Sequence, residues 1–113
     1  MTYEYIVDKV RETFENADAR EIFEHVAFQV NIIGEGEGAF YIEVAARSVV
    51  VEPYDYHARD GLVTATGDAL ITMAVGEITV VDAIKKGLIK VDAKPNKLAA
   101  MLRIKILQYA QKD

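Results

Sequence analysis

Residues 64–102, TATGDALITMAVGEITVVDAIKKGLIKVDAKPNKLAAML, contain the pattern that decides the fold. The predicted order is helix, helix, strand and helix, over residues 69–75, 79–86, 88–92 and 98–110. Gly76 and Gly87 each follow a helical segment, which is where glycine commonly ends a helix. Asn96 is the expected N-cap of the last helix, because its side chain can accept a backbone N–H bond.

The predicted closing helix is apolar on more than one side. On a helical wheel, one broad apolar arc contains Leu98, Ala99, Leu102, Ile106, Tyr109 and Ala110. A second apolar arc contains Ala100, Ile104 and Leu107. A helix that rests on one sheet needs a single apolar stripe, so we expect a second apolar neighbour. That neighbour is another helix, another subunit or a bound ligand.

Before this segment, the alternation of apolar and polar residues predicts four antiparallel strands. They are expected over residues 26–33, 39–45, 49–52 and 62–66. The glycine-rich turn at residues 34–38 joins the first two strands into a hairpin with one shared apolar face. An amphipathic helix is predicted near the N-terminus, with an apolar arc formed by Tyr3, Ile6, Val7, Val10 and Phe14. Asp18 is the expected cap of a short helical turn that ends at Phe23.

Together these elements predict an α+β fold, a mostly antiparallel five-stranded sheet with helices packed on one face. The chain is expected to form a single domain, residues 1–113. Its apolar fraction of 51% is ordinary for a globular protein, and no apolar run approaches the roughly 18 residues of a spanning helix. The absence of cysteine excludes disulfides and thiol catalysis, and with no secretory leader evident it predicts a cytoplasmic protein.

Charge is divided unevenly along the chain, whose net charge is −5. Residues 85–113 have eight basic and two acidic side chains, a net charge of +6, which leaves −11 for residues 1–84. The basic segment either neutralises the acidic part of its own fold or meets an anionic membrane surface transiently. Nucleic acid is not expected as a partner, because the overall charge is negative and no aromatic residues alternate with the basic ones.

The sequence contains no recognisable arrangement of catalytic or metal-binding residues, so no cofactor or metal is expected. His25 and Glu21 have helical spacing, but two ligands without a third do not make a metal site. His57 lies in the polar segment 54–61, which has no adjacent nucleophile. One enzymatic alternative is a small cavity isomerase of the ketosteroid isomerase type, whose base and partner would come from Asp55 or Asp60 and Tyr54 or Tyr56.

Residues 64–102 resemble the sterol carrier protein 2 family of lipid-binding domains. The shared features are a helix that ends near a glycine, here Gly76-Glu77-Ile78, and a glycine that leads into an alternating strand, here Gly87-Leu88-Ile89-Lys90-Val91. The hairpin FQVNIIGEGEGAFYIEV, residues 28–44, is similar to the opening strands of the family, so the likeness covers residues 14–108. The chain departs from the family in having Glu77 where lysine is frequent and Asp92-Ala93 where glycine-asparagine is frequent.

The resemblance implies a non-catalytic domain that binds and transfers a lipid or fatty-acyl chain in an apolar tunnel between the sheet and the later helices. The implied protein is a small stand-alone member of prokaryotic type. The expected tunnel residues point inward from the sheet and from the helices: Phe28, Val30, Phe40, Ile42, Leu70, Met73, Val80, Ile84, Met101 and Leu102. Methionine suits such a site because its side chain adapts to irregular ligands.

An interaction module is the alternative to a carrier. In that hypothesis the second apolar arc of the closing helix is a homodimer interface or docks on a larger enzyme. The resemblance implies a related role, in which an accessory protein presents an isoprenoid or other lipid substrate to an enzyme. Both hypotheses require a closing helix with more apolar surface than one sheet can cover.

Overall fold

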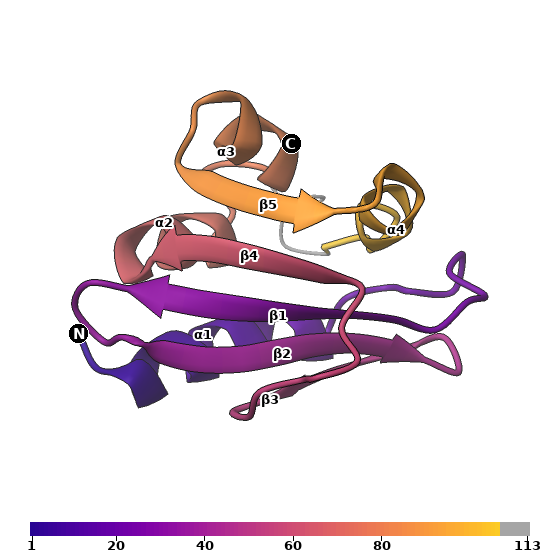
Figure 1. Cartoon of the computed structure of the whole chain (residues 1–113), viewed down its shortest axis with the longest axis horizontal. Coiled ribbons are helices and arrows are strands. Elements are labelled where there is room, and N and C mark those ends of the chain that lie inside the picture. Colours follow the sequence, from indigo (N-terminus) through magenta and orange to yellow (C-terminus); the bar gives the residue numbers. More distant parts are fainter. Residues whose placement is uncertain (107–113) are drawn as a thin grey trace.

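The computed structural model describes residues 1–106, in which five strands form one sheet (Figure 1). The strands are β1 (Val26–Ile33), β2 (Gly38–Ala45), β3 (Ser48–Glu52), β4 (Gly61–Thr66) and β5 (Ile89–Ala93). Their order across the sheet is β3-β2-β1-β4-β5, and every neighbouring pair is antiparallel except β1 and β4, which run parallel. The predicted fold class, an α+β protein with a mostly antiparallel five-stranded sheet, is confirmed.

The parallel pair arises because the chain crosses the sheet between β3 and β4. After the edge strand β3 the chain runs over the outer face, where the backbone N–H of Tyr56 donates to Gln29 Oε1 at 3.1 Å. It then reaches Asp60, whose backbone N–H donates to the carbonyl of Ala27 at 2.7 Å. This crossing places β4 on the free side of β1 with Gly61 level with Phe28, and the two strands then run parallel. The prediction of four antiparallel strands is therefore wrong for this pair.

Four helices cover the inner face of the sheet. They are α1 (Tyr3–Glu15), α2 (Gly67–Ala74), α3 (Val80–Lys85) and α4 (Pro95–Met101). Helix α1 packs against β3 and α2, and its buried residues Ile6, Val7 and Val10 join the main core. Helix α4 lies at the opposite end of the sheet, where Ala100 belongs to a second core cluster with Phe28. Within residues 1–106 no helix is long and apolar enough to cross a bilayer.

The core rests on the hairpin of β1 and β2. The register pairs Val30 with Phe40 and Phe28 with Ile42, so four large apolar side chains lie side by side on the inner face. Phe28, Val30 and Phe40 are at most 3% exposed. The intervening residues, such as Gln29 and Tyr41, belong to the outer face because successive strand residues point to opposite sides.

Helices α2 and α3 end in the same glycine-dependent turn. Gly76 and Gly87 have φ of 79° and 73°, the left-handed region that glycine adopts most easily. At the end of α3, the N–H of Gly87 donates to Ile84 O at 3.1 Å and the N–H of Leu88 donates to Ala83 O at 2.9 Å. Both helices therefore end at the predicted glycines, and the two bonds satisfy carbonyls that the helix leaves unpaired.

The last helix differs from its prediction at both ends. It begins at Pro95 after the N-cap Lys94, because proline is well suited to the first helical position, and Asn96 is inside the helix. It ends at Met101, so the predicted helix over residues 98–110 is wrong beyond that residue as far as 106. The remaining predicted residues, Leu107, Gln108, Tyr109 and Ala110, lie outside the described residues.

A pairing between distant residues explains this early end. The backbone N–H of Asp18 donates to Lys105 O at 2.8 Å, and the N–H of Lys105 donates to Asp18 O at 2.9 Å. These bonds hold Lys105 in an extended conformation that a helix would not allow. The predicted cap at Asp18 is confirmed, because its carboxylate accepts from the backbone N–H of Arg20 at 2.9 Å. A single turn follows, in which the N–H of Ile22 donates to Ala19 O at 3.0 Å, so the turn is shorter than the predicted one, which ended at Phe23.

We expect Gly87→Ala to lower the free energy of unfolding by about 1–2 kcal/mol, since alanine is strained at positive φ. A Cβ atom at Gly87 would meet no other atom within 4 Å, so the loss measures the backbone conformation alone. Gly87→Asn is the matched control and should lose less, because asparagine tolerates the left-handed region. Equal losses in urea unfolding of the two variants would contradict this account.

Candidate functional site

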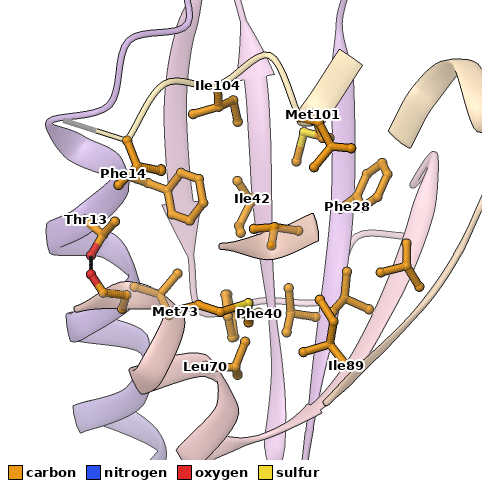
Figure 2. A pocket seen from close by; sticks show the side chains of 18 of the residues that line it. Thr13, Phe14, Phe28, Phe40, Ile42, Leu70, Met73, Ile89, Met101 and Ile104 are labelled. Carbon is orange, nitrogen blue, oxygen red and sulfur yellow. Dashed lines mark hydrogen bonds between the residues drawn. The ribbon is translucent and has the colours of Figure 1, made fainter. Parts of the chain in front are cut away.

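An apolar cavity of about 120 Å³ lies between the sheet and the helices (Figure 2). Its described lining contains one polar side chain, that of Thr13. The lining residues are Val10, Thr13, Phe14, Phe28, Val30, Phe40, Ile42, Val63, Leu70, Met73, Ala74, Val80, Ile89, Val91, Leu98, Met101, Leu102, Ile104 and Ile106. Such a lining can exclude water and hold an apolar group, but it offers no acid, base or nucleophile.

Nine of the ten predicted tunnel residues line this cavity. From the sheet these are Phe28, Val30, Phe40 and Ile42, and from the helices and the chain after α4 they are Leu70, Met73, Val80, Met101 and Leu102. Figure 2 shows Leu70, Met73, Phe40 and Ile42 arranged around one space. Ile84 is the exception, since it packs against the main core without lining the cavity. Whether these residues bind a ligand remains a proposal.

The prediction omitted the walls formed by α1, β4 and β5. Helix α1 contributes Val10 and Phe14, both members of the apolar arc that its sequence pattern shows. Strand β5 contributes Ile89 and Val91, which alternate with the exposed residue Lys90. The patterns of α1 and β5 therefore identified the correct faces, whereas alternation alone did not decide which face of β4 is turned inward. The patterns could not show that these faces meet at one space, because that depends on the order of the strands.

The Thr13 hydroxyl is turned away from the cavity and towards helix α2. Its Oγ1 lies 2.8 Å from the carbonyl oxygen of Ala74 and 3.2 Å from that of Lys9 (Figure 2). Among residues 1–106 no buried side-chain nitrogen or oxygen lacks a hydrogen-bond partner. The described lining therefore presents no unpaired buried side-chain polar atom that would bind a headgroup.

One wall of the cavity lies outside any helix or strand. Residues 102–106, called here the 102–106 segment, supply Leu102, Ile104 and Ile106 to the lining. The backbone pairing with Asp18 holds this segment in place, and Lys105 Nζ lies 2.5 Å from Glu21 Oε2 on the surface. That contact raises the pKa of Lys105, while the hydrogen bond from the Arg20 side chain lowers the pKa of Asp18 to about 2.

The residues of the isomerase hypothesis do not line the cavity. The Tyr56 hydroxyl donates to Glu43 Oε2 at 2.9 Å, and His25 Nε2 lies 2.5 Å from the same carboxylate oxygen. These hydrogen bonds, from His25 first, lower the pKa of Glu43. Asp60 accepts from the backbone N–H of Ala27, while Tyr54 is 64% exposed. Within the described residues no group of three or more metal-binding side chains comes together.

No protein-family profile and no curated protein matches the chain. Solved structures do match it, among them palmitated sterol carrier protein 2 like 2 from Aedes aegypti, with a TM-score of 0.65 and 20% identity. That likeness covers 90% of this chain and 92% of the other. A ubiquinone synthesis protein, UbiJ-SCP2, matches with a TM-score of 0.61 and 14% identity, over 88% and 89% of the two chains.

The chain has the sterol carrier protein 2 fold. The resemblance inferred from residues 64–102 is confirmed at the level of the fold, which is what likenesses at 14–20% identity can show. The same fold matches part of the sec-alkylsulfatase Pisa1 from Pseudomonas sp., with a TM-score of 0.55 and 15% identity. This chain spans 13% of the length of that sulfatase and is itself covered to 85%.

We expect Thr13→Val to lower the free energy of unfolding by about 1–2 kcal/mol, because it removes the buried hydroxyl that links α1 to α2. Thr72→Val is the matched control. The Thr72 hydroxyl donates to Asp68 O at 2.8 Å on the exposed side of α2, so its loss should change stability by less than about 0.5 kcal/mol. Similar urea midpoints for the two variants would show that the link between the helices contributes little.

Proposed function

We propose that this protein binds the apolar tail of a lipid or fatty acid in the cavity and transfers it without catalysing a reaction. The observation that carries this proposal is the apolar lining, to which the sheet and all four helices contribute. The fold supports it, because the matching mosquito protein was solved in a palmitated form. Absence of acid, base and nucleophile from the described lining supports a carrier rather than an enzyme.

The size of the cavity indicates that the structure represents a closed state. At about 24 cal/mol per Å³, an empty space of 120 Å³ costs about 3 kcal/mol, which a domain of ordinary stability tolerates. Lipid-sized ligands occupy pockets of about 300 Å³ or more. A tail of eight methylenes gains about 6 kcal/mol on burial, enough to offset the displacement of a weakly held wall. One wall must therefore move when a tail enters.

The 102–106 segment is the wall that we expect to move. The strands on the other side of the cavity belong to continuous ladders of hydrogen bonds. This segment instead has three backbone bonds to the end of α4, next to it in the chain, and two to Asp18, its only backbone bonds to a distant part of the described chain. Its ion pair with Glu21 joins two side chains that are each more than 60% exposed, and exposed pairs contribute little. If the 102–106 segment moved away from the cavity, it would free the volume that Leu102, Ile104 and Ile106 now fill.

A second candidate function is that of an accessory protein that presents a bound isoprenoid or other lipid to an enzyme. The likeness to UbiJ-SCP2, a ubiquinone synthesis protein, favours it. In this function the partner, an enzyme or a second copy of the chain, would cover Leu102, which lines the cavity and is 40% exposed. Tail binding is common to both candidates, so it is the property to test first.

We expect Val63→Phe to weaken the binding of a fluorescent fatty acid by at least about tenfold, since the ring would fill the cavity and leave the tail in water. Its stability in urea should be unchanged or higher by up to about 1 kcal/mol, because the ring fills an empty space. Val50→Phe, on the opposite face of the sheet, is the matched control and should bind as the wild type does. Displacement by unlabelled palmitate measures both. If Val63→Phe binds the fluorescent fatty acid as tightly as the wild type, the ligand binds outside this cavity.

We expect a disulfide between Asp18→Cys and Lys105→Cys to slow ligand entry by about tenfold or more. These residues form an antiparallel bridge that exchanges two hydrogen bonds, so their Cα atoms lie about 5.5 Å apart, within reach of a disulfide. The natural chain has no cysteine, so only this disulfide can form. Stopped-flow binding before and after reduction compares the two states of one protein. Equal association rates would show that the tail enters by another route.

A further inference from the structure

The lysines that lack an ion-pair partner gather in one part of the described chain. Lys97 lies 3.0 Å from a carboxylate oxygen of Glu24, and Lys105 contacts Glu21 in the same way. By contrast, no carboxylate of residues 1–106 lies within 4 Å of the ammonium groups of four lysines, Lys85, Lys86, Lys90 and Lys94. All four fall between the end of α3 and the start of α4. The basic segment is therefore only partly neutralised by its own fold.

Exposed aliphatic side chains accompany three of these lysines. Val81 is 43% exposed and lies one helical turn before Lys85 on α3. Leu88 is 46% exposed and is held against the end of α3 by its bond to Ala83. Two residues further on, Lys90 is exposed on the side of β5 opposite to that of Ile89 and Val91. We call the set Val81, Lys85, Lys86, Leu88 and Lys90 the α3 surface.

The opposite face of α3 belongs to the lipid cavity. Val80 lines the cavity, and Ala83 is fully buried in the main core. Figure 1 shows α3 beyond β5, at the margin of the molecule in this view. The helix is six residues long and has one acidic residue, Asp82, in its first turn. A single short helix thus separates the cavity from a basic and apolar exterior.

We propose that the α3 surface docks on an anionic phospholipid bilayer. Lysine ammonium groups are attracted to anionic headgroups, while aliphatic side chains at the same level enter the boundary of the acyl region. Docking through this face would bring one wall of the cavity against the membrane, where a tail can be exchanged. The inference rests on the proposed lipid-binding function, because that function requires a place at which cargo is collected or released.

The dimensions of the surface favour a bilayer over a protein partner. A stable protein interface commonly uses about 20–30 residues on each side and about 800 Å² per partner. The α3 surface consists of five residues at the end of one short helix. A membrane needs no complementary shape, so a few lysines and projecting aliphatic groups suffice. Capture of an acidic protein in place of a bilayer would overturn the proposal.

The first test measures how the protein partitions between buffer and vesicles. We expect binding to phosphatidylcholine vesicles that contain about a third phosphatidylserine, and little binding without the anionic lipid. Lys85→Gln with Lys86→Gln should weaken it about 30-fold, at about fivefold per lysine. Lys9→Gln with Arg20→Gln is the control with the same change in net charge at sites away from α3, and it should retain binding within about threefold.

The second test removes the aliphatic groups. Val81→Ser with Leu88→Ser should weaken vesicle binding by at least about tenfold, whereas Ile33→Ser with Val50→Ser, which removes comparably exposed aliphatic groups elsewhere, should not. All variants should displace fluorescent fatty acid as the wild type does. Membrane docking is overturned if the wild type does not bind anionic vesicles. It is also overturned if a control variant loses as much vesicle binding as the variant with which it is paired. If the wild type does not bind fatty acid, the proposed function is overturned instead.

Discussion

The apolar inner face of the β1–β2 hairpin is the constraint on which the rest of the structure depends. Its pairs Val30–Phe40 and Phe28–Ile42 place four large side chains next to one another in the middle of the sheet. Helix α1 packs against β3 and α4 against β1, and the short helices α2 and α3 also line the space above this face. A cavity results, and every proposal made for this protein concerns what fills that cavity or how it is reached.

The parts of the structure around the cavity have separate physical roles. The strands make the rigid wall, since each is held by backbone bonds to its neighbours. The 102–106 segment makes the weakly held wall, since its only strand-like pairing among the described residues is with Asp18. Helix α3 makes the wall that also faces outward, with Val80 inside and, outside, lysines that have no carboxylate partner among residues 1–106. A lipid carrier needs all three features, because it must exclude water from the cavity, admit a lipid tail and contact the membrane that supplies the lipid.

The sequence predicted the local elements closely and the long-range pairings poorly. Strand β1 was predicted with its observed bounds, and both glycine-terminated helices were found, because alternation and glycine caps depend on neighbouring residues. The prediction extended the closing helix too far, since the spacing of the apolar residues after Met101 fits a helix as well as the spacing before it does. Only the pairing of Lys105 with Asp18 decides against it, and those two residues are far apart in the chain.

The sequence by itself determined the inward face of α1, β1 and β2, and nine of the ten residues predicted to line a tunnel line one cavity. This was possible because the direction of a side chain follows from the period of its own strand or helix. The tertiary structure alone decided that β4 runs parallel to β1, that the cavity measures about 120 Å³ and that the lysines around α3 lack carboxylate partners among the described residues. Each of these depends on the distance between groups from separate elements, and the period of a single element carries no information about such distances.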